Sequence, residues 1–274
     1  MSDRRPGAPS PEAAGAALPS GPPPGPAAAI PVVPSPAATL ILVRAGGRAP
    51  EILLLKRSAQ ARFMPNAYVF AGGAVDPADA TDEVYDVCAG LDDGQASERL
   101  ALHANGLRFF VAAIREAFEE CGLLLAYDPA DRIVDLTGWD EERLRRLRTQ
   151  VCAGQPGLAA ICKLNGWRLA VDGLAYFDHW ITPPDLKRRF DTRFFIARAP
   201  ARQYASLAGD EMSDLVWRSA AEALAGHSRG EFLLMRATRT ILGEIARFDH
   251  LDALFAFAQG GRKILPTTPG SGSD

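Results

Sequence analysis

Residues 112–127 read AAIREAFEECGLLLAY and join an acidic cluster to a strongly apolar run. At about 100° per residue, a helix places Glu116, Glu119 and Glu120 together on one side. The opposite side carries only apolar residues, namely Phe110, Ile114, Phe118 and Cys121. One side of this helix is therefore expected to face a core, while the other gathers three carboxylates.

The glycine that follows the acidic cluster predicts where the helix ends. Gly122 suits the position just past a helix, where a positive φ is wanted. We expect a helix at about 107–121, and the apolar LLLAY after it is typical of a buried strand.

Three neighbouring carboxylates need an explanation. Like charges at this spacing destabilise a helix by roughly 0.2–0.5 kcal/mol. Two carboxylates about 6 Å apart repel by about 3 kcal/mol at an effective dielectric constant of 20, and Arg115 is the one cation close by in the sequence. A solvated acidic face is one interpretation. A bound divalent cation is the other, and carboxylates suit hard cations such as Mg²⁺, Mn²⁺ or Ca²⁺.

The letters REAFEECGL (115–123) resemble the second half of the Nudix box, R-E-U-x-E-E-x-G-U, in which U is apolar. The first half of that box is a glycine, five residues and a glutamate. Gly73 can begin it, but Asp79 stands where the glutamate belongs. Arg115 follows Gly73 by 42 positions, where an uninterrupted box has 14, so an insertion of about 28 residues divides the box. We place the insertion at about 76–106.

An interrupted box resembles the Nudix branch that includes coenzyme A diphosphatases. LLLKRSAQARFMPNAYVFAGG (53–73) is similar to their signature, although Ala71 replaces a proline and the spacing is about one residue shorter. Two later stretches, 179–195 and 214–224, also look like this branch. The resemblance covers roughly residues 38–225. It implies an α/β fold, a Nudix-type α/β/α sandwich with a mixed β-sheet and a helical insertion inside the box.

The resemblance also implies a metal site. Glu116, Glu119 and Glu120 hold Mg²⁺, or Mn²⁺ in its place, together with the carbonyl oxygen of Gly72. Glycine suits this role because no Cβ blocks the approach, although an ordinary turn is the alternative interpretation of this position. Arg115 positions a box glutamate through a salt bridge.

A base and phosphate-binding groups complete the expected site. Either Glu120 or Glu211 accepts the proton. Glu211 lies in the acidic stretch GDEMSD (209–214), where Asp210 and Asp214 are the next candidates and a plain solvated loop is the alternative. Guanidinium groups match phosphate oxygens, and the arginines that flank the resembling segments are candidate substrate-binding residues. They are Arg57, Arg62, Arg189 and Arg193.

The implied function is metal-dependent hydrolysis of a small-molecule diphosphate. Coenzyme A or an acyl-CoA is the expected substrate, giving 3′,5′-ADP and 4′-phosphopantetheine or its acyl form. ADP-ribose or a nucleotide sugar is the alternative substrate. A Nudix-fold binding or regulatory domain without turnover is the alternative of another class.

The remaining chain of 274 residues sets limits. A net charge of −3 argues against a general nucleic-acid binder, and the apolar runs are too short to span a membrane. Residues 1–36 are rich in Pro and Ala and are expected to be disordered, while 37–266 form the domain and 267–274 a flexible tail. Four cysteines without a C-x-x-C pair indicate a reducing, cytoplasmic location.

Periodicity gives a coarse layout of the other elements. A hairpin is expected from 38–44 and 51–57, a short strand at 68–70 and a helical stretch near 96–104. The helix at 140–152 carries ERLRRLR, which we interpret as a solvated face. Further strands are expected at 174–182, 192–199 and 214–219, and further helices at 157–163, 219–226, 238–248 and 251–258.

Overall fold

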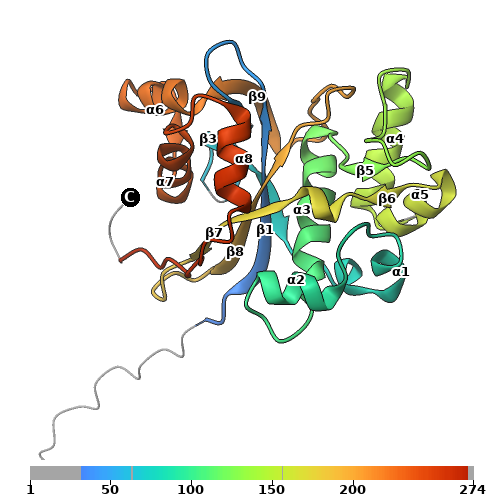
Figure 1. Ribbon diagram of the computed structural model, residues 1–274. Helices are drawn as coiled ribbons and strands as arrows, with labels where there is room; N and C mark the ends of the chain where they lie inside the picture. The colour runs from blue at the N-terminus through green and yellow to red at the C-terminus, as the bar shows by residue number, and fades with distance from the viewer. Residues whose placement is uncertain (1–31, 63, 156, 271–274) are drawn as a thin grey trace, which may run out of the picture. The chain divides into compact units, whose positions relative to one another are not determined.

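The computed structural model describes residues 32–62, 64–155 and 157–270 (Figure 1). The tails predicted for the two chain ends therefore lie largely outside the described residues. Within these residues, no helix has the length and apolar character needed to cross a membrane.

A mixed eight-stranded sheet forms the centre of this part of the chain (Figure 1). Six of its strands run in the order β10-β3-β2-β1-β8-β7, while β4 also pairs with β1 and β9 with β2. β1 and β8 are parallel, whereas β1 and β2 form the expected antiparallel hairpin. The mixed sheet predicted from the sequence is thus confirmed. The strands are β1 (Ser35–Arg44), β2 (Glu51–Arg57), β3 (Ala67–Val69), β4 (Ala71–Ala74), β7 (Ala175–Ile181), β8 (Phe190–Arg198), β9 (Met212–Ser219) and β10 (Leu233–Leu234).

Helices cover both faces of the sheet. On one face lies α3 (Leu107–Cys121), whose residues share a core with one set of strand side chains. On the other face a second core includes side chains of three C-terminal helices. These are α6 (Ala220–Ser228), α7 (Arg236–Ile245) and α8 (Leu251–Gln259). The expected α/β/α layering is confirmed.

The helix that carries the acidic cluster has the bounds that the sequence predicts. α3 spans Leu107–Cys121, and Gly122 follows with φ of 74°. Its apolar side is fully buried, with Phe110, Ile114 and Phe118 inaccessible to solvent. The helix is therefore anchored by its core side, which fixes the direction in which the glutamates point.

The insertion folds into three short helical pieces rather than the one predicted helix. They are η1 (Pro77–Ala80), α1 (Asp82–Tyr85) and α2 (Asp93–Arg99). The helical stretch predicted near 96–104 overlaps α2 but lies too far along the chain, because Asp92 and Gln95 form a capping box that starts the helix at Asp93, and it ends at Arg99. Asp93 also accepts hydrogen bonds from the backbone of Asn105 and Leu107, so the insertion folds back onto the start of α3.

The run LLLAY is a strand only at its end. β5 (Ala126–Tyr127) pairs with β6 (Arg168–Leu169) in a separate two-stranded sheet. The three leucines before β5 are buried, but Gln203 rather than a neighbouring strand bonds to the backbone of Leu124. Burial of the three leucines accounts for the apolar pattern, and the strand predicted for the whole run is therefore too long.

The predicted solvated face of ERLRRLR is wrong at one position. α4 (Glu141–Cys152) exposes Arg145 and Arg146, which pair with Glu142. Arg148 instead points inward and is only 4% exposed. α5 (Leu158–Asn165) follows, and η2 (Val171–Gly173) leads into β7.

The boundaries of the folded part also differ from those predicted. Ser35 and Pro36, assigned to the N-terminal tail, already belong to β1 and pair with the start of β8. Thr267, assigned to the C-terminal tail, exchanges backbone hydrogen bonds with β7 at His179 and Ile181. Pairing with strands β8 and β7 of the sheet, which composition does not reveal, extends the domain in both directions.

Candidate active site

The acidic cluster on α3 is organised around one arginine. The Nε and Nη2 atoms of Arg115 donate to the two carboxylate oxygens of Asp79, at 2.8 and 2.9 Å, and Nη2 also donates to the carbonyl of Ala74. Nη1 donates to Glu116 at 2.9 Å and lies 3.4 Å from Glu119. Arg115 therefore holds two glutamates and the end of β4 in one network.

Asp79 is the residue that the sequence reasoning left without a role. It is 2% exposed, lies in η1 of the insertion, and accepts a hydrogen bond from the backbone of Asp76. Its bidentate pair with Arg115 brings the insertion back to the acidic cluster. The signal was present in the sequence, because Asp79 follows Gly73 at the spacing of the box glutamate.

Glu116 and Glu120 lie directly against the glycines of β4. A Cβ atom on Gly73 would come within 2.4 Å of an oxygen of Glu116, so any larger residue there would push this carboxylate aside. The backbone N–H of Gly72 donates to Glu120 at 3.0 Å. The sequence reading expected the carbonyl of Gly72 to face the site, and the contact seen is made by its amide.

The environment of the three glutamates disfavours their charged forms. Burial, together with the charge of Glu119, raises the pKa of Glu116 to about 7. Burial and the nearby Glu116 raise the pKa of Glu120 well above its ordinary value, and burial also raises the pKa of Glu119. Such a cluster gains from a bound cation, because the cation removes the repulsion that the protein itself leaves in place.

The donor chemistry fits a hard divalent cation, but the described side chains are not gathered into a ligand set. In residues 32–270, apart from 63 and 156, no group of three or more His, Cys, Asp or Glu is spaced to hold a metal ion. Arg115 and the amide of Gly72 engage the carboxylate oxygens in this arrangement. A metal would replace some of these contacts.

A cavity of about 640 Å³ lies on the other side of the two glycines. Gly72, Gly73 and Ala74 form part of its wall, and strands β1 and β8 form its floor. The three glutamates are not among the described residues that line it. The main chain of β4 thus stands between the acidic cluster and the cavity.

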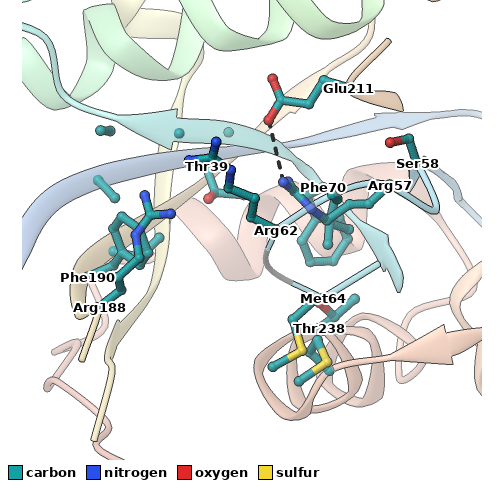
Figure 2. Close-up of a pocket in the computed structure, with 18 of the residues that line it drawn as sticks. Thr39, Arg57, Ser58, Arg62, Met64, Phe70, Arg188, Phe190, Glu211 and Thr238 are labelled. Atoms are coloured by element: carbon teal, nitrogen blue, oxygen red, sulfur yellow. Dashed lines mark hydrogen bonds and ion pairs between the residues drawn. The ribbon is translucent and has the colours of Figure 1, made fainter. Parts of the chain in front are cut away.

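The cavity combines cationic and apolar groups, as Figure 2 shows. Arg188 and Phe190 lie together at one side, with the guanidinium carbon 5.8 Å from the ring centre. At the other side, Arg57 reaches Glu211 at 3.4 Å. The apolar lining comes from Met64, Val69, Phe70, Phe190, Phe194 and Met235.

The comparisons with known proteins identify the family. A family model described as the NUDT19 Nudix domain matches residues 91–238, more than half of the chain. The chain belongs to this Nudix family. The resemblance on which the sequence analysis relied is confirmed.

Curated Nudix relatives cover most of the chain. It is 26% identical over 237 residues to the acyl-coenzyme A diphosphatase NUDT19 of Xenopus laevis, which is 76% of this chain and 62% of that protein. The corresponding human protein is 28% identical over 256 residues, covering 77% of this chain and 64% of that one. The chain thus spans less than two thirds of the length of these two relatives.

A solved structure supports the Nudix fold. The NUDIX hydrolase of Alicyclobacillus acidocaldarius aligns with a TM-score of 0.68 and 26% identity, covering 82% of this chain and 96% of that chain. The Nudix α/β/α sandwich predicted from the sequence is therefore the fold of the described domain.

Within this Nudix domain, the structure brings Glu211 to the cavity. Its side chain is 66% exposed, and its carbonyl accepts a hydrogen bond from the backbone of Ser58. Asp210 also lines the cavity. Asp214 does not, because it lies in β9 opposite Lys56 and accepts a hydrogen bond from Tyr68.

Two of the four expected arginines lie elsewhere. Arg57 and Arg62 line the cavity, but Arg189 donates to the backbone of Thr182 and Val32. Arg193 is buried on the opposite face of the sheet, where it lies over the ring of Phe109 and pairs with Asp191.

The alternation of strand residues explains this difference. Successive side chains of a strand point to opposite faces, and in β8 it is Phe190, Thr192 and Phe194 that line the cavity. Arg193 consequently faces α3. Arg188, just before the strand, is the arginine of this segment that does line the cavity.

Proposed function

We propose that this chain is a metal-dependent Nudix hydrolase that cleaves the diphosphate linkage of coenzyme A or an acyl-CoA. The products are 3′,5′-ADP and 4′-phosphopantetheine or its acyl form. The observation that carries the proposal is a largely buried carboxylate cluster next to a cavity rimmed by arginines. The printed names of the Xenopus and human relatives support the substrate class.

Glu116, Glu119 and Glu120, with the carbonyl of Gly72, would hold the cation, and Mg²⁺ or Mn²⁺ suits these oxygen donors. When bound, the metal supplies charge neutralisation at the phosphate oxygens and acidifies a water molecule. Arg115 keeps Glu116 and Glu119 aligned through its paired contacts and is itself fixed by Asp79.

A carboxylate takes the proton of the attacking water. Water adds to one phosphorus, the bridging P–O bond breaks, and the two phosphate products separate. Glu120 is one candidate base, because the raised pKa of its carboxyl makes the ionised form a stronger proton acceptor. Glu211 is the other, since it is exposed at the cavity and held near Arg57.

The cavity supports a nucleotide diphosphate as the substrate. Arg57, Arg62 and Arg188 offer guanidinium groups to phosphate oxygens, including the extra 3′-phosphate of coenzyme A. The aromatic and thioether side chains offer an apolar wall to an adenine ring or to the pantetheine arm.

The expected cytoplasmic location stays a prediction. The four cysteines, on which that prediction depends, are free.

The test is a turnover assay of the full chain against a panel of diphosphates. Coenzyme A, acetyl-CoA, ADP-ribose and a nucleotide sugar are incubated with Mg²⁺, with Mn²⁺ or with EDTA, and the products are identified by mass spectrometry. We expect metal-dependent release of 3′,5′-ADP from the CoA compounds. Metal-dependent cleavage of ADP-ribose alone would shift the substrate class, while no turnover of any compound would point to a binding domain.

A further inference from the structure

Arg148 departs from every other arginine of its helix. Its side chain is buried, whereas Arg143, Arg145 and Arg146 of α4 are partly or fully exposed. Among the described residues no carboxylate pairs with it, and its Nε has no hydrogen-bond partner. A guanidinium is expensive to bury without a counter-charge, so its contacts must serve the local structure.

Within the described part of the chain, the hydrogen bonds of Arg148 go to two segments that carry proposed active-site carboxylates. Nη2 donates to the backbone carbonyl of Glu119 at 2.8 Å. Nη1 donates to the carbonyl of Ser206 at 2.9 Å and to its hydroxyl at 3.2 Å. One planar group therefore connects the last turn of α3 to the segment that joins β8 to β9.

The first contact closes the end of α3. The last four carbonyls of a helix have no partner within it. Here Phe118 accepts from Gly122, Cys121 accepts from the backbone of Ser206, and Glu119 accepts from Arg148. The turn that presents Glu119 and Glu120 is thus held from outside, and a cation at this end also suits the helix dipole.

The second contact fixes the segment that leads to Glu211. Residues 199–211 connect β8 to β9, and Ser206 lies midway along them. The connection runs on from Ser206 to Asp210 and Glu211 at the cavity. Gly122 makes close packing possible, because a Cβ atom there would already touch both Arg148 and Ser206, at 3.3 Å each.

We propose that Arg148 is a positioning residue that sets the Glu119–Glu120 turn and the Glu211 segment relative to each other. This inference rests on the proposed function, since it gives both segments a part in one reaction. Arg148 acts through the carbonyls of Glu119 and Ser206 and through the Ser206 hydroxyl, and it is not among the described residues that line the cavity. Its removal should therefore weaken metal binding and slow turnover by more than a general loss of stability explains.

Gln203 provides a matched control. It is 7% exposed, lies in the same β8–β9 connection, and makes three hydrogen bonds, to Leu124 and Val134. These bonds hold the segment after α3 without contacting Glu119 or Ser206. Gln203→Leu should cost stability comparable to that lost in Arg148→Met, but it leaves the two carboxylate segments connected.

The experiment compares Arg148→Met, Arg148→Lys and Gln203→Leu in the full chain. Melting temperature, the Mn²⁺ dissociation constant from electron paramagnetic resonance, and kcat and KM for coenzyme A are measured well below the melting transition. For Arg148→Met we expect Mn²⁺ binding about tenfold weaker and kcat about ten- to a hundredfold lower, with KM nearly unchanged. Arg148→Lys should restore little of the Mn²⁺ affinity and kcat, because a single ammonium group does not reproduce the guanidinium that donates to Glu119 and Ser206 from its two Nη atoms.

Two results would overturn the inference. One is wild-type Mn²⁺ affinity and kcat in Arg148→Met, and the other is an equal loss in Gln203→Leu at equal stability. Full recovery of Mn²⁺ affinity and kcat in Arg148→Lys would mean that only the positive charge of Arg148 matters. If the wild type binds Mn²⁺ but hydrolyses nothing, the proposed function fails while the affinity comparison still decides the role of Arg148. If the wild type binds no Mn²⁺, both fail.

Discussion

Glu120 is 8% exposed and has Glu116 as a close acidic neighbour. Its carboxylate accepts a hydrogen bond from the amide of Gly72, which does not offset the burial. At the residue scale, the site thus holds unfavourable charge in a fixed position. The cost of burying this carboxylate, together with its repulsion from Glu116, is what a divalent cation would relieve, so affinity for metal and instability without it have the same origin.

We expect Glu119→Gln and Glu120→Gln to abolish turnover while the fold is retained, because each change removes a metal-binding charge and keeps the shape. Turnover of coenzyme A with Mg²⁺ is the measurement, and circular dichroism reports the fold. Rates above about a tenth of wild type in both variants would contradict the metal assignment.

Glu120→Gln should also stabilise the metal-free protein at alkaline pH. An acid whose pKa is raised by folding contributes least stability when ionised, so stability is lost as the pH rises from the unfolded value through the folded one. For Glu116 this pH window runs from 4.5 to about 7. For Glu120 it begins at the same pH and extends to higher pH. In EDTA at pH 8, Glu120→Gln should melt roughly 2–4 °C higher for each 1 kcal/mol of burial and repulsion cost that it removes.

At the scale of elements, the chemistry and the selectivity come from different segments. α3 supplies the carboxylates, whereas the end of β2, the loop after it and the turn before β8 supply the arginines of the cavity. Strand alternation decides which residues of β8 reach the cavity, and this is why Arg188 replaces Arg193 in the proposed site.

We expect the preference for coenzyme A over dephospho-coenzyme A to fall about ten- to a hundredfold in Arg62→Ala or Arg188→Ala. A charge-assisted contact with the 3′-phosphate contributes roughly 1.5–3 kcal/mol. Arg57→Ala should act less selectively, because Arg57 also pairs with Glu211. The measurement is the ratio of kcat/KM values for the two substrates.

Arg198→Ala is the control for these variants. It is an exposed residue of β8 that pairs with Asp252 and does not line the cavity in the described part of the chain. If its substrate ratio changes as much as that of Arg188→Ala, or if none of the cavity variants narrows the ratio, the 3′-phosphate assignment fails while the metal site is unaffected.

At the scale of the whole molecule, one domain of described residues contains both the acidic cluster and the cavity. Its first strand begins at Ser35, and the carbonyl of Val32 still accepts a hydrogen bond from Arg189. The Pro- and Ala-rich composition of residues 1–31 cannot build a core. The domain is therefore expected to work without them.

A truncated chain that begins at Val32 should keep the melting temperature and kcat of the full chain. The cut is placed before Val32 so that its contact with Arg189 survives. Differential scanning calorimetry and the coenzyme A assay test this. A drop of more than a few degrees, or a severalfold loss of kcat, would show that the N-terminal segment contributes to the domain.

Local signals predicted the fold well. Apolar periodicity and Gly122 gave both ends of α3, and the spacing of REAFEECGL gave the family. Long-range contacts decided the rest. The burial of Arg148 depends on carbonyls 29 and 58 positions away, and the pairing of Asp79 with Arg115 spans 36 positions. No periodicity in one sequence reports such contacts, so the arginine positions were the least predictable part of the site.

The two glycines of β4 have an evolutionary consequence. Because a strip of main chain separates the carboxylates from the cavity, residues around the cavity can change without altering the side chains of the acidic cluster. Substitutions near Ser58 and Arg188 can then reshape the cavity while the acidic cluster keeps its geometry. The glycines themselves have no such freedom, since one added methyl group at Gly73 would displace Glu116.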